Sequence, residues 1–93
     1  MSHINIHRAH TLSHEQAREA AESVAAHLDR KFSLSYHWKG DSLHFERSGI
    51  SGHMELEEKE VRINVRLGFL LLPLRPKLEQ AIHRYMDDVF NDN

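Results

Sequence analysis

Four runs of alternating apolar and polar residues follow one another between residues 34 and 67, and their pairing constrains the fold more than any other feature of the chain. Such alternation is typical of strands that bury one face. Gly40-Asp41 and Ser48-Gly49 separate the first three runs and have the composition of tight hairpin turns. Glu58-Lys59, a less typical turn sequence, separates the last two runs. The pattern therefore predicts a four-stranded antiparallel meander.

Tight turns at these three points fix a register that can be checked against the apolar pattern. In a correct register each inward-facing side chain meets another, because a slip of one residue moves a whole strand to the opposite face. Every predicted pair passes this test, and the small Gly52 leaves room for the ring of Phe45. The pairs are Trp38 with Leu43, Tyr36 with Phe45, Leu43 with Met54, Phe45 with Gly52, Met54 with Ile63, and Leu56 with Val61.

Three further elements surround this meander. Residues 3–8 alternate as a short strand. Ser13 and Gln16 can form a capping box at the start of an amphipathic helix, and Pro76 suits the first turn of a second one. We therefore expect an α+β fold with the order β-α-β-β-β-β-α, in which two helices pack on one face of a single antiparallel sheet.

Composition narrows the class of protein. A chain of 93 residues can bury one core, so a single domain spanning residues 1–93 is expected. No cysteine is present, which excludes disulfides and thiolate metal sites. The formal net charge of −2 gives no general attraction to nucleic acid. Neither a signal peptide nor an apolar run of transmembrane length is visible, and we expect a cytoplasmic protein.

The segment GFLLLPLR interrupts the alternation before the last helix. One interpretation is a buried connection, partly covered by a second copy of the chain in a homodimer. The other is an exposed apolar surface, because four large side chains in a row cannot all point in one direction. The flanking Arg66, Arg75 and Lys77 would suit an interface that is apolar below and anionic above. The candidate contact residues are Phe69, Leu70, Leu71, Leu72 and Leu74.

Nine histidines are unusual in a chain of this length. The register places His37 opposite His44, and His44 opposite His53, on the outer face of the sheet. Zinc could be shared by the three imidazoles, with Glu46 nearby, but the outer two would be about 10 Å apart. Plain solvated positions are therefore expected, with a metal site or a pH-sensitive face as alternatives.

An inner set of large side chains raises the possibility of a ligand cavity between sheet and helices. In so short a chain these side chains are expected to fill the space themselves. The set consists of Tyr36, Trp38, Phe45 and Met54. No phosphate-binding loop, nucleophile elbow or HExxH motif occurs, so neither an enzyme nor a cofactor is expected.

Three segments carry a family resemblance: INIHRAHTLS, HWKGDSLHFERSGISGHMEL and EVRINVRLGFLLLPLRPKLEQAI. Their most specific parts are His7-Arg8, His10-Thr11-Leu12, Trp38-x-Gly40-Asp41 and the block from Val65 to Leu70. From Ile4 to Phe90 the chain resembles the polyhydroxyalkanoic acid system protein family, small granule-region proteins of bacteria that store polyester. The element order also resembles a trimmed helix-grip domain, which implies the strand order 1-5-4-3-2.

The family resemblance implies a non-enzymatic accessory protein of polyhydroxyalkanoate storage. Such a protein would associate with the granule surface or with granule proteins, as a homodimer. The alternative is a small protein that binds a hydrophobic hydroxyacyl ligand, or an enzyme acting on one, in a cavity between sheet and helices.

Overall fold

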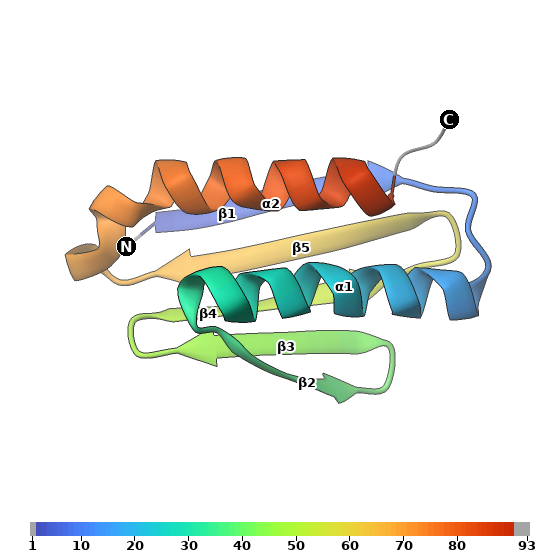
Figure 1. Cartoon of the computed structure of the whole chain (residues 1–93), viewed down its shortest axis with the longest axis horizontal. Helices are drawn as coiled ribbons and strands as arrows, with labels where there is room; N and C mark the ends of the chain where they lie inside the picture. Colours follow the sequence, from blue (N-terminus) through green and yellow to red (C-terminus); the bar gives the residue numbers. More distant parts are fainter. Residues whose placement is uncertain (1, 91–93) are drawn as a thin grey trace.

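The computed structural model describes residues 2–90 and contains a five-stranded antiparallel sheet with two helices on one face (Figure 1). The strand order is β1-β5-β4-β3-β2, as the helix-grip resemblance implied, and the α+β class is confirmed. The elements in chain order are β1 (Ser2–Ala9), α1 (His14–Phe32), β2 (Ser35–Lys39), β3 (Ser42–Arg47), β4 (Ile50–Leu56), β5 (Glu60–Leu67), the 3₁₀-helix η1 (Phe69–Leu74) and α2 (Arg75–Val89).

The predicted register of the meander is confirmed. Tyr36 pairs with Phe45, Leu43 with Met54, and Leu56 with Val61, and the remaining predicted pairs also match. Because the inward side chains of all strands meet on one face, that face forms the core together with the apolar stripes of α1 and α2. The opposite face of the sheet carries polar side chains.

The first helix begins and ends at residues that satisfy its free backbone groups. The Ser13 hydroxyl accepts from the Gln16 amide, and the Gln16 side chain accepts from the Ser13 amide, so the predicted capping box is confirmed. At the other end Ser33 takes a left-handed conformation with φ of 60° and donates its amide to the carbonyl of Asp29.

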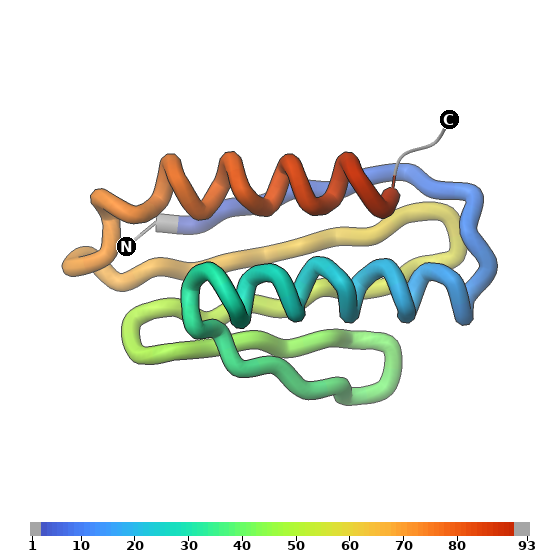
Figure 2. Tube along the Cα trace, viewed as in Figure 1, coloured from blue at the N-terminus to red at the C-terminus, as the bar shows by residue number. Residues whose placement is uncertain are grey.

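The two helices divide the inner face of the sheet between them. Helix α2 packs beside β1, whereas α1 packs over β2, β3 and β4 (Figure 2). The molecule measures 38 × 25 × 21 Å, and η1 lies at one end of its longest axis. The β1–α1 connection and the β4–β5 turn lie at the other end. The apolar segment singled out by the sequence is therefore placed at an extremity of the molecule.

Candidate functional site

Helix η1 forms where the chain leaves the sheet and must reverse before α2. Gly68 is extended, and its amide donates to the carbonyl of Gly49 over 2.9 Å, which ties the start of η1 to the β3–β4 turn. The amide of Leu71 then donates to the carbonyl of Gly68 over 3.0 Å. A 3₁₀-helix has three residues per turn, so the side chains of this short segment point in different directions around its axis.

The six residues of η1 consequently divide into an exposed set and an anchoring set. Phe69 and Leu70 are 71% and 79% exposed, and Leu72 is 38% exposed. Leu71 and Leu74 are partly buried and pack against the core. We call Phe69, Leu70 and Leu72 the apolar tip. Each of the two sequence interpretations thus describes part of the segment, because anchor residues and exposed residues alternate within it.

Exposed apolar side chains of this size are unusual when they are contiguous. Scattered single leucines on a surface need no explanation, but a cluster of them marks a contact surface. Phe69 and Leu70 keep most of their surface in solvent, so burial within the fold does not account for apolar side chains at these positions. The apolar tip is therefore the strongest candidate for a functional surface.

The proposed cavity residues lie partly in the core and partly at its edge. Phe45 and Met54 are buried, whereas Tyr36 and Trp38 are only partly buried. The Trp38 indole donates Nε1–H to Glu22 Oε1 over 2.9 Å, and the guanidinium of Arg18 lies 3.9 Å from its ring centroid. These two partners come from α1, so they hold the indole against that helix at the β2 edge.

The three histidines of the outer face form the row that the register predicted. The ring centroids of His37 and His44 are 5.7 Å apart, and those of His44 and His53 are 5.6 Å apart. The rings are stacked, with interplanar angles of 16° and 29°, so their nitrogens do not converge on one point. Within residues 2–90, no group of three or more histidine or carboxylate side chains is placed to hold a metal ion.

The pKa of the central histidine, His44, is lowered from its ordinary value. Partial burial of His44 is the main cause, followed by the charge of Lys39 and the neighbouring His53 and His37, while Glu46 opposes the shift. The unfolded chain therefore binds more protons than the folded chain as the pH falls through and below the ordinary value of 6.5. The contribution of His44 to the free energy of unfolding is therefore fully present above the ordinary pKa of 6.5. It is lost as the pH falls through the lower pKa of the folded chain.

We therefore expect the variant His44→Gln to lose less thermal stability than the wild type between pH 8 and pH 5.5. The difference in unfolding midpoint should be on the order of 2 °C, since a surface group contributes well below 1 kcal/mol and a domain of this size shifts about 4–8 °C per kcal/mol. Thermal unfolding followed by circular dichroism measures it. The control His3→Gln removes a histidine from the same face but outside the row, and equal pH dependence in both variants would contradict the prediction.

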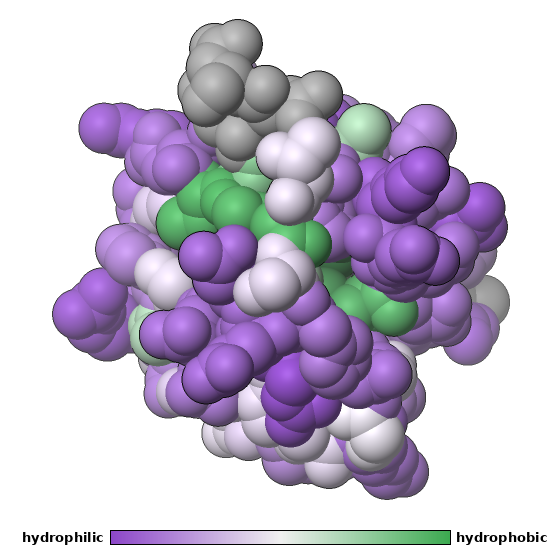
Figure 3. Space-filling view, turned by 90° about the vertical axis from the view of Figure 1, so that its right-hand side faces the viewer, coloured by the Kyte–Doolittle hydropathy of each residue, from purple (hydrophilic) through white to green (hydrophobic). Residues whose placement is uncertain are grey.

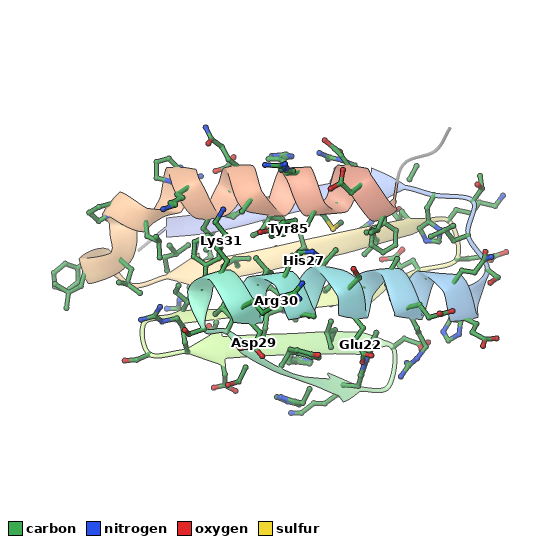
Figure 4. The ribbon with its side chains drawn as sticks, viewed as in Figure 1. Glu22, His27, Asp29, Arg30, Lys31 and Tyr85 are labelled. Atoms are coloured by element: carbon green, nitrogen blue, oxygen red, sulfur yellow. The ribbon has the colours of Figure 1, made fainter. Side chains whose placement is uncertain are left out.

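A groove between the helices was not predicted from the sequence. His27 and Tyr85 face each other across it with ring centroids 4.8 Å apart (Figure 4). His27 donates Nδ1–H to the carbonyl of Ser23 over 2.7 Å, which leaves Nε2 as the acceptor nitrogen of the neutral ring. The groove has a volume of about 340 Å³ and is completed by Val24, Arg84, Asp88 and Val89.

A second hollow lies at the end of the molecule away from η1 (Figure 3). It has a volume of about 350 Å³ and is bordered by the buried His10 and by Leu12 and Leu56. His10 accepts from the Leu12 amide over 3.1 Å, and within the described residues its Nε2 has no hydrogen-bond partner. Figure 3 shows apolar side chains in the middle of this face, with hydrophilic side chains around them.

Comparison with known proteins identifies the family. The family model described as "Putative polyhydroxyalkanoic acid system protein" matches residues 4–90. No curated protein matches the chain. Among residues 2–90, no helix is long and apolar enough to cross a membrane. The match covers nearly the whole fold, including η1, so the chain belongs to the polyhydroxyalkanoic acid system protein family.

Proposed function

We propose that this protein is a non-enzymatic, cytoplasmic accessory protein of polyhydroxyalkanoate storage that associates with the granule through the apolar tip. The observation that carries the proposal is the exposure of Phe69 and Leu70 at one end of a chain that belongs to this family. A polyester granule presents an apolar surface to water. Burial of a large apolar side chain in such a surface contributes about 1.5–3 kcal/mol, so a few exposed side chains suffice for reversible association.

The shape of the tip supports a surface contact. The anchors Leu71 and Leu74 pack against the core, and the bond from Gly68 to Gly49 holds the start of η1 on the sheet. The exposed side chains are thus presented by a backbone that is already ordered. Little conformational entropy is then lost when they are buried, which favours binding.

The variant Phe69→Glu/Leu70→Glu is expected to weaken association with native polyhydroxyalkanoate granules by at least about 100-fold. Two large side chains lose their burial, and two charges would have to be desolvated. Co-sedimentation of purified protein with granules measures this. Circular dichroism should show both proteins folded, because the replaced side chains are exposed.

The matched control is Thr11→Glu/Asn5→Glu, which adds the same charge at exposed positions away from the tip. It should sediment with granules like the wild type. Absence of wild-type protein from the granule pellet, or equal loss in both variants, would refute the proposed function.

The homodimer stays a prediction, and light scattering of the same samples measures the oligomeric state.

A further inference from the structure

Basic side chains gather in the half of the molecule that carries the apolar tip. They come from the start of α2, the end of β5 and the β3–β4 turn, which adjoin η1, and from the last turn of α1, which lies farther from it (Figure 1). Figure 4 labels Arg30 and Lys31 on that last turn of α1. This end of the molecule holds half of the twelve Lys and Arg residues. We call these six residues the basic collar: Arg30, Lys31, Arg47, Arg66, Arg75 and Lys77.

Contacts within the fold fix part of the collar next to the tip. Arg47 donates to the carbonyl of Phe32 over 3.0 Å, which links the β3–β4 turn to the end of α1. Arg75 donates to the carbonyl of His3 over 3.2 Å and lies 3.5 Å from a carboxylate oxygen of Glu79. Arg30, Lys31 and Lys77 are exposed. The same end also carries Asp29, Glu46 and Glu79, so the six cations exceed the acids by three.

The opposite end of the molecule is rich in acidic side chains. The β4–β5 turn and the end of α2 carry pairs of adjacent acids, and Asp41 lies in the β2–β3 turn. Two of the cations at this end are paired there: Arg8 lies 2.9 Å from Asp87, and Arg18 lies 3.4 Å from Asp41. The molecule is therefore polarised along its 38 Å axis, with apolar and basic groups together at one end.

The tip is too small to be a stable protein interface by itself. Even an aromatic side chain buries only about 150–250 Å², so three side chains fall short of the roughly 800 Å² that each partner contributes to a stable complex. A lipid surface needs no such area and no shape complementarity. It is apolar beneath and charged at the headgroups, which matches an apolar tip inside a basic collar.

We propose that the tip inserts into an interface covered by anionic phospholipid, with the apolar tip among the acyl chains and the basic collar at the phosphate groups. This inference rests on the proposed function in one respect, namely that the tip is the contact surface. It adds the chemistry of the partner. Binding should require negative headgroups and should weaken as salt screens them.

Flotation with vesicles tests the partner directly. The wild type should bind vesicles of phosphatidylglycerol and phosphatidylcholine at low salt, and it should bind pure phosphatidylcholine at least about 10-fold more weakly. Removing two exposed collar cations, in Lys31→Gln/Lys77→Gln, should weaken binding to the anionic vesicles by about 20-fold. The matched control Lys39→Gln/Lys59→Gln removes the same charge from the opposite end and should bind like the wild type.

Equal binding to neutral and anionic vesicles, or equal loss in the two lysine variants, would overturn the inference. The inference would also be overturned if the wild type did not bind vesicles but formed a dimer that Leu70→Glu abolished. The tip would then be a contact between two copies of the protein. Particles of purified polyester without lipid separate this inference from the proposed function. Binding to particles but not vesicles refutes only the lipid inference, whereas binding to vesicles but to neither particles nor native granules refutes only the granule role.

Discussion

Replacing Gly52 with alanine is expected to lower the free energy of unfolding by about 3 kcal/mol. A Cβ atom at this position would lie 2.6 Å from the carbonyl oxygen of Asn64 and 2.7 Å from Cε2 of Phe45. The oxygen belongs to the backbone of the neighbouring strand, so it cannot move without disturbing the β4–β5 pairing. The Phe45 ring is buried and has little space into which it can turn.

Urea unfolding followed by circular dichroism measures the loss. The control is Gly40→Ala, because an added Cβ at Gly40 has no neighbour within 4 Å although its φ is 60°. Gly40→Ala should therefore show only the backbone strain of a left-handed alanine, about 1–2 kcal/mol. The prediction is wrong if the two variants are equally stable, since crowding at Gly52 would then have no effect beyond backbone strain.

The crowding at Gly52 also shows why the sheet could be predicted from the sequence. The register follows from a requirement that spans four strands at once: an inward side chain must meet an inward side chain, and a ring must have space opposite. Phe45 opposite Gly52 satisfies both conditions. The histidine row follows from the same register, because His37, His44 and His53 occupy paired outward positions.

The details of the candidate site depend on information that the register does not contain. No periodicity in a six-residue 3₁₀ segment tells which leucine turns inward, since that depends on the approach of the β3–β4 turn to η1. Stacking of the imidazoles depends on side-chain rotation. The groove of His27 and Tyr85 depends on how α1 and α2 lie beside each other, and each helix stripe alone leaves that arrangement open.

The variant Leu71→Glu is expected to destabilise the protein by about 2–4 kcal/mol, whereas Leu70→Glu should stay within about 0.5 kcal/mol of the wild type. The two leucines are adjacent but differ in their surroundings. A Cβ atom built on Gly49 would lie only 2.7 Å from Leu71 Cδ1, so this side chain is packed closely on the β3–β4 turn. Leu70, by contrast, is 79% exposed.

Thermal unfolding separates the two variants, because the loss expected for Leu71→Glu corresponds to at least about 8 °C in midpoint. Equal midpoints would mean that Leu71 does not anchor η1. If only Leu71→Glu has a lower midpoint, its loss of granule binding reflects a displaced η1. Loss of granule binding in the stable Leu70→Glu then reflects removal of the contact itself. Residues that hold the tip in place and residues that touch a partner can thus be distinguished within two adjacent positions.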